Sequence, residues 1–121
     1  MMGVRGKYDV LLGDLREDDS IIQKGITIID TYQLQLSDAN KYLSFNSSTN
    51  KNITIPKNIF SEGDIIYIEQ TGIGVFTIVG YDVNITVNGN KKSGGQYSVV
   101  GIFYKDASIN ANVCTVIGGV A

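Results

Sequence analysis

Short runs of β-forming residues, separated by turn-forming residues, fill most of the chain after residue 30. The runs are rich in isoleucine, valine, tyrosine and threonine, which are favoured in strands. Seven or eight of them follow one another at near-regular spacing, which is typical of a small all-β domain. We therefore expect an antiparallel β-sandwich or roll. The runs are TYQLQL (31–36), KYLSFN (41–46), NITIP (52–56), DIIYIEQ (64–70), VFTIVG (75–80), VNITVNGN (83–90), 94–106 and NVCTVIGG (112–119).

Local patterns within these runs indicate faces and ends. The first run alternates, so Tyr32, Leu34 and Leu36 are expected to point inward. Pro56 should end its strand because it has no backbone N–H. Asn88–Gly89 is a dipeptide favoured in hairpin turns, and a turn is expected there. No repeat of fixed period is visible, and the only helix candidates are weak (residues 13–20 and 56–63).

The run GGQYSVVGIFYKD, residues 94–106, is apolar on both of its faces. In a strand, side chains alternate between faces, and a strand that is half exposed should be polar on one of them. A symmetry-related copy of the chain or a partner protein could cover the second face. Alternatively, the strand is central within one monomer and is covered by other strands or by the N-terminal arm. The two sets of side chains are Tyr97, Val99 and Phe103, and Val100, Ile102 and Tyr104.

Composition changes near residue 30, since charges are dense before it and thin out afterwards, where asparagine becomes frequent. We therefore divide the chain into an extended N-terminal attachment arm and linker (1–30) and a β-module (31–121). The arm would contact its partner through apolar anchors, with charge pairing to set the register. An extra strand of the module itself is the alternative for this segment. The anchors are Val10, Leu11, Leu12 and Leu15, and the basic residues are Arg5, Lys7 and Arg16.

Several function classes are disfavoured by composition. The pI of about 4.9 and the net charge of -2 offer no electrostatic reason to bind nucleic acid. No stretch approaches the ~20 apolar residues that cross a membrane, and the N-terminus does not resemble a secretory signal. The chain has no histidine, which removes the commonest general base and metal ligand. The single cysteine, Cys114, is expected to be a small buried hydrophobic residue.

Three groups of residues could still carry chemistry or binding. The acidic run at 14–19 lacks the ligand spacing of a calcium loop. Glu62 and Asp64 flank a glycine in an ordinary turn sequence rather than forming a catalytic pair. We therefore expect no enzyme activity, no metal and no cofactor. The tyrosines could form a sugar-stacking surface, although tyrosine is also common in strands; they are Tyr32, Tyr42, Tyr67, Tyr81, Tyr97 and Tyr104.

The order of the motifs resembles a β-module found in virion proteins of tailed bacteriophages. The likeness begins with LSDANKYLSFNSSTNKNITIP and continues through EGDIIYIEQTGIGVFTIVG, VNITVNG and GGQYSVVGIFYKD to NVCTVIGG. It covers residues 32–119, and the segment GKYDVLLGDLREDD resembles the N-terminal attachment segments of phage fibre proteins. Relatives carry a tryptophan near the end of the last strand, where this chain has Cys114.

The resemblance implies a non-enzymatic structural protein. It suggests a head fibre or capsid decoration subunit. The abundance of isoleucine, asparagine and lysine, which indicates an AT-rich genome, and the short length suggest in particular a head fibre protein of a crAss-like phage. Such a subunit would be a homotrimer, made in the cytoplasm of the bacterial host and located on the capsid surface of the virion. Its partners would be the major capsid protein or another virion protein, and further fibre subunits. The alternative is a receptor-binding module of a tail or neck fibre that recognises a host surface glycan.

Overall fold

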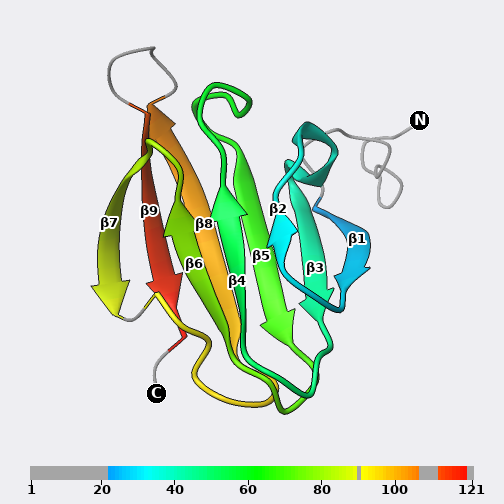
Figure 1. The fold of residues 1–121 in the computed structure, drawn as a ribbon. Coiled ribbons are helices and arrows are strands. Elements are labelled where there is room, and N and C mark those ends of the chain that lie inside the picture. The colour runs from blue at the N-terminus through cyan, green and yellow to red at the C-terminus, as the bar shows by residue number, and fades with distance from the viewer. Residues whose placement is uncertain (1–21, 90, 107–111, 120–121) are drawn as a thin grey trace, which may run out of the picture.

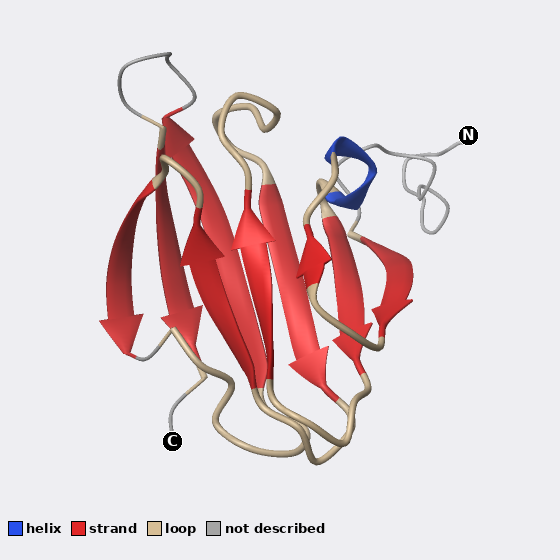
Figure 2. Cartoon of the chain, viewed as in Figure 1, coloured by secondary structure: helices blue, strands red, loops and turns tan. Residues whose placement is uncertain are grey.

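The computed structural model describes residues 22–89, 91–106 and 112–119, and these residues form two packed β-sheets. Figure 2 shows that strands make up nearly all of the regular structure; a single turn of 3-10 helix, Leu36–Asp38, is the exception. The expectation of a two-layer, all-β domain is confirmed. The strands are β1 Gln23–Ile28, β2 Tyr32–Gln33, β3 Lys41–Phe45, β4 Lys51–Ile55, β5 Ile65–Gln70, β6 Phe76–Gly80, β7 Asn84–Gly89, β8 Val99–Asp106 and β9 Val113–Gly118.

The two sheets are built by a chain that winds back and forth between them. The larger sheet has the order β1-β3-β5-β8-β9-β7, and the smaller has the order β2-β4-β6 (Figure 1). Consecutive strands from β1 to β6 therefore alternate between the sheets. We call each pair, β1 with β2, β3 with β4, and β5 with β6, a coil. Because neighbours within a sheet come from successive coils, they run in the same direction.

The expected antiparallel arrangement is therefore wrong for most of the molecule. The pairs β1–β3, β3–β5, β2–β4, β4–β6 and β7–β9 are parallel, and only β5–β8 and β8–β9 are antiparallel. Side chains alternate in the same way in parallel and antiparallel sheets. The sequence of a run therefore does not show whether its neighbours run in the same or the opposite direction. The expected turn at Asn88–Gly89 is also wrong, because these residues continue β7 and pair with β9.

The coils repeat although the sequence shows no fixed period. Lys41 pairs with Ile66, and Lys51 pairs with Phe76, so both sheets advance by 25 positions from the second coil to the third. From the first coil to the second, Ile28 pairs with Phe45 after only 17 positions. The varying length of the connections hides the repeat in the sequence.

The turns that lead into β3 and β5 share one hydrogen-bonding pattern. The backbone N–H of Gln35 donates to the Asp38 carboxylate at 2.8 Å, and the N–H of Ser61 donates to the Asp64 carboxylate at 2.8 Å. In both turns the aspartate N–H donates back to the carbonyl of the first residue. Such aspartate turns compete well with other local structures because the side chain replaces a backbone acceptor. Leu36, expected to point inward, lies in the first of these turns and is 62% exposed.

At the other end of the strands, the connection after β5 lies directly on the connection after β3. The N–H of Gly74 donates to the Ser47 carbonyl at 2.7 Å, and that of Val75 donates to the Asn50 side chain at 2.9 Å. A Cβ atom on Gly74 would lie 2.2 Å from the carbonyl oxygen of Thr49. The glycine spacing of TGIG thus permits the two backbones to approach.

The core fills the space between the sheets. Phe45 of the large sheet meets Phe76 of the small sheet edge to face, with ring centroids 5.4 Å apart. Ile53 and Ile55 of β4 are fully buried, and Pro56 follows them directly, as the sequence indicated. The buried apolar residues are Ile28, Leu34, Leu43, Phe45, Ile53, Ile55, Phe60, Ile66, Ile68, Phe76, Ile78, Val100, Ile102, Tyr104, Cys114 and Val116.

We predict that Gly74→Ala destabilises the fold by about 1–3 kcal/mol, the usual cost of overpacking. The added methyl group would meet backbone atoms, which have no flexible end that could move aside. Urea unfolding of the purified protein measures this effect. The matched control is Ile73→Ala, next to it on a side chain that is 71% exposed. Equal stability of the two variants would contradict the stacking contact.

Candidate interaction surface

The large sheet has one side against the small sheet and one side that no described strand covers. On β5, Ile66 and Ile68 are buried, whereas Ile65 and Tyr67 are only partly buried. The same alternation holds along β3, β8 and β9. We call the second side the outer face. From these four strands its residues are Tyr42, Ser44, Ile65, Tyr67, Glu69, Val99, Gly101, Phe103, Val113, Thr115 and Ile117.

Two aromatic rings form the centre of the outer face. The rings of Tyr67 and Phe103 pack edge to face, with centroids 6.0 Å apart and an interplanar angle of 88°. Gly101 pairs with Tyr67 across the β5–β8 ladder. A Cβ atom on Gly101 would lie 3.2 Å from each ring, so both rings rest against the glycine. The absence of a side chain at Gly101 leaves the space that the edges of both rings occupy.

The outer face is apolar in the middle and charged towards two ends. Tyr42 is 43% exposed and Val99 is 46% exposed, although both lie on strands within the sheet. Glu69 sits opposite Val99 at one end of β5, and the exposed Lys105 lies near the other end, at the irregularity of β8 between Tyr104 and Asp106. An apolar surface with a polar border is the common anatomy of a protein interface.

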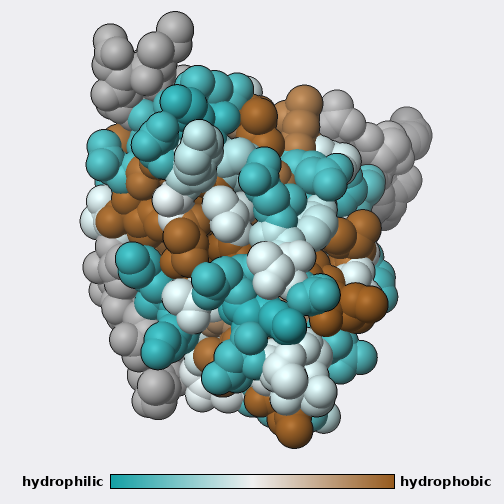
Figure 3. Space-filling model, viewed as in Figure 1, coloured by the Kyte–Doolittle hydropathy of each residue, from teal (hydrophilic) through white to brown (hydrophobic). Residues whose placement is uncertain are grey.

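The outer side of the small sheet has a different character. Its outward residues include Gln33, Asn52, Thr54 and Thr77, which are polar. Figure 3, which views the molecule from this side, shows hydrophilic and intermediate colours in the middle of the face and a hydrophobic area to the left of them. Val79 of β6 is the exposed apolar residue of this sheet, at 37%. The contrast between the two sides singles out the outer face of the large sheet as the candidate interaction surface.

The described residues of the chain cover one face of the run at 94–106 and leave the other face open. Val100, Ile102 and Tyr104 lie in the core, which leaves them buried against the small sheet. Val99 and Phe103 are on the outer face, and Tyr97 precedes the strand at a turn, 68% exposed. β8 is also central within the sheet, between β5 and β9. The arm residues Arg5, Lys7, Val10, Leu11, Leu12, Leu15 and Arg16 lie outside the described residues.

Sequence reasoning missed the part of the outer face that β3 and β5 supply. Tyr42 pairs directly with Tyr67, and Ile65 pairs with Phe103. The signal was present in DIIYIEQ, which is apolar at successive positions, as the 94–106 run is. Two strands that are apolar on both sides are expected to be adjacent in the sheet when their second sides form one continuous apolar surface.

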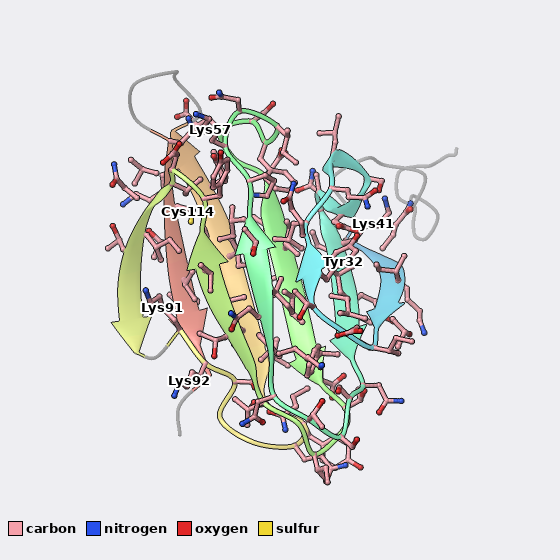
Figure 4. The ribbon with its side chains drawn as sticks, in the orientation of Figure 1. Tyr32, Lys41, Lys57, Lys91, Lys92 and Cys114 are labelled. Atoms are coloured by element: carbon pink, nitrogen blue, oxygen red, sulfur yellow. The ribbon has the colours of Figure 1, made fainter. Side chains whose placement is uncertain are left out.

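The tyrosines do not form one sugar-stacking surface. Tyr104 is buried, and its hydroxyl donates to Asn112. Tyr32 is partly buried and donates to Asp38 at 2.7 Å; burial, and then this carboxylate, raises the pKa of Tyr32. Tyr81 lies beside Lys57, whose ammonium is 5.8 Å from the ring centroid, and Figure 4 shows Lys57 at the end of the sandwich opposite Lys92. Only Tyr42 and Tyr67 are paired neighbours in the sheet.

The other residues that the sequence offered for catalysis or metal binding do not form a site in the described part of the chain. Asp64 accepts the N–H of Ser61 within its turn, and the neighbouring Glu62 is exposed. Within the described ranges, no three metal-ligating side chains gather around a common point. None of the helical structure described in the chain is long and apolar enough to span a bilayer. Cys114 is fully buried, as expected.

Comparisons with known proteins identified no relative of the chain. The chain matches no protein-family model, no curated protein and no solved structure.

We predict a loss of stability at alkaline pH that depends on Cys114. Burial raises the pKa of this thiol from 9.0 to about 11. The folded state therefore holds the proton more tightly than the unfolded state. The thiol's stabilising contribution is complete below about pH 9 and is lost as the pH rises towards about 11. Between pH 8 and pH 10 the free energy of unfolding should fall by about 1 kcal/mol from this group.

Urea unfolding at the two pH values measures this loss, and Cys114→Val is the control. Burial, and then the charge of the Cys114 thiolate, raises the pKa of Tyr104. The valine variant keeps the first cause and removes the second, so the difference between the two proteins reports the thiol together with its effect on Tyr104. An equal alkaline loss in the valine variant would show that Cys114 does not titrate as described.

Proposed function

We propose that the chain is a non-enzymatic structural protein of a tailed-phage virion, a head fibre or capsid decoration subunit. The motif order described above supports this family. The main support for a structural role is the composition of the outer face. Four large side chains lie on this side of the sheet, which no described strand covers: Tyr42, Tyr67, Val99 and Phe103. A surface of this kind serves association better than chemistry, because it has apolar side chains and no convergent polar groups.

In this proposal the outer face holds the subunits of a homotrimer together. Each large apolar side chain removed from water contributes on the order of 1.5–3 kcal/mol. The rings of Tyr67 and Phe103 are already fixed against Gly101, so little side-chain freedom is lost when a second copy covers them. Glu69 and Lys105 at the ends of the face would set the register between copies by charge pairing.

Attachment to the virion is assigned to the N-terminal end. The chain enters β1 at the edge of the large sheet, so residues 1–20 join the module beside its first coil. The basic residues Arg5, Lys7 and Arg16 would pair with acidic groups of the major capsid protein or of another virion protein. The outer face is then free for self-association.

We predict that the purified chain has about three times the mass of 13.1 kDa in light scattering. Val99→Asp should remain folded and become monomeric at micromolar concentration, because it places a charge in the proposed interface. Val100→Asp should unfold the protein instead, since Val100 is fully buried. Asn52→Asp, on the outer side of the small sheet, is the control and should stay trimeric. A monomeric wild-type chain, or a trimeric Val99→Asp variant, would contradict the interface.

We further predict that the protein is recovered with heads when phage heads and tails are separated. A head fibre or decoration subunit is part of the capsid surface, so mass spectrometry should detect it there in amounts comparable to other minor capsid components. Recovery with tails alone would favour a tail or neck fibre. Its absence from purified particles would refute the structural role altogether.

A further inference from the structure

One tyrosine has a backbone conformation that its residue type rarely adopts. Tyr97 has a φ angle of 72°, in the left-handed region. The other non-glycine residues with positive φ among residues 22–89, 91–106 and 112–119 are Asn40, Asn58 and Asp82. Asparagine and aspartate tolerate this region because their short polar side chains can hydrogen-bond locally, whereas a bulky side chain is disfavoured there. Of these four positions, Tyr97 is therefore the strained one.

A turn just before β8 imposes this conformation. The N–H of Ser98 donates to the Gly95 carbonyl at 3.1 Å, so Tyr97 is the third residue of a four-residue turn, where a type II turn requires positive φ and usually has glycine. The N–H of Tyr97 donates to the Gln70 carbonyl at 2.6 Å, and the N–H of Gln70 donates to the Ser98 carbonyl at 2.9 Å. Two residues thus oppose one residue of β5, which is a β-bulge that usually begins with glycine when φ is positive. Both patterns favour glycine where the chain has tyrosine.

Two polar side chains hold the turn in place on either side of Tyr97. The Ser98 hydroxyl donates to the Gly95 carbonyl at 2.8 Å, within the turn itself. The Gln96 amide donates to the Thr71 carbonyl at 3.0 Å, which ties the turn to the connection after β5. A strained conformation persists when the surrounding structure fixes it in this way, and such positions are found preferentially at functional sites.

The side chain of Tyr97 is exposed beside one end of the outer face. Tyr97 is 68% exposed, and within the described ranges its ring has no aromatic, cationic or hydrogen-bonding partner. Val99, which is 46% exposed on the outer face, follows two positions later, and Glu69 pairs with Val99 across the ladder. A tyrosine on a fixed backbone offers a large contact area and loses little freedom on binding, and tyrosine is enriched among the residues that dominate binding energy.

We propose that Tyr97 is a preorganised anchor between copies of the chain, and that its ring packs against the outer face of a neighbouring copy. This inference rests on the proposed function, because it extends the proposed trimer interface to the turn before β8. Backbone strain at Tyr97 lowers the stability of each subunit, and contact of the ring with a second copy offsets that loss. A second copy fits better than a glycan, because a sugar site needs free polar groups beside the ring, whereas Gln96 and Ser98 are hydrogen-bonded within the chain.

Glycine substitution of the full chain in two backgrounds tests the anchor, because strain and association should respond in opposite directions. In the monomeric Val99→Asp background, Tyr97→Gly should raise the midpoint of urea unfolding, since glycine adopts positive φ readily. In the otherwise wild-type chain, Tyr97→Gly should weaken association by on the order of tenfold or more, measured by light scattering over a dilution series.

Two further variants serve as controls. Tyr97→Phe keeps both the ring and the strain, and should restore association that Tyr97→Gly loses. Tyr81→Gly removes another exposed tyrosine, which is 59% exposed, follows β6 of the small sheet and does not have positive φ. It should lower the urea midpoint, because glycine has no conformational advantage there, and leave the oligomer mass unchanged.

The outcomes separate failure of the anchor from failure of the proposed function. A trimeric wild-type chain with an equally tight Tyr97→Gly variant would refute the anchor alone; if only the wild-type chain also bound an array of bacterial surface glycans, the ring would belong to a glycan site. A lower urea midpoint for Tyr97→Gly in the Val99→Asp background would refute the strain. A monomeric wild-type chain, or a trimeric Val99→Asp variant, would refute the proposed interface and the anchor with it.

Discussion

The backbone contact between successive coils is the interaction on which the rest of the structure depends. The connection at residues 71–75 rests on that at residues 46–50, at a distance that only glycine at 72 and 74 permits. This contact fixes the offset between coils, and the offset in turn fixes which side chains are neighbours in each sheet. Tyr42 lies beside Tyr67 and Ile53 lies beside Ile78 for that reason. The neighbours that the second and third coils contribute to the core and to the outer face follow from this spacing of 25 positions.

Local patterns in the sequence predicted most of the strands. Val100 and Ile102 were placed correctly on a shared face because alternation depends only on the strand itself. Strand direction and pairing depend instead on the path of the connections. Those connections differ in length between coils, and the equivalence of Asp38 and Asp64 becomes visible only through their hydrogen bonds. Short strands with turns between them look alike in the sequence whether neighbouring strands are parallel or antiparallel. The antiparallel arrangement was expected because it is the simpler of the two.

The candidate surface was predicted in part. Two-sided apolarity identified the strand of Val99 and Phe103, but three of the six residues singled out there belong to the core. The sequence alone does not distinguish the face that another layer of the same chain covers from the face that stays open. β1 was assigned to the linker because charges are dense before residue 30. β1 also has few inward side chains that would mark it as a strand: Gly25 faces Leu43 with no side chain of its own, and the ladder is irregular between Lys24 and Thr27. Because Leu43 of the neighbouring strand fills the space beside Gly25, β1 shows little of the apolar alternation that marks a strand in the sequence.

The position of β8 has a consequence for synthesis of the chain on the ribosome. β8 lies between β5 and β9, and β9 joins β7 to the sheet. Three coils can therefore stack as they emerge, but the second edge of β5 stays unpaired until residues 99–103 are made. β7 has no place in the sheet until residues 113–118 follow. The nascent chain thus carries an open, apolar sheet edge until β8 and β9 have both been made, and during that interval it can pair wrongly with other nascent copies.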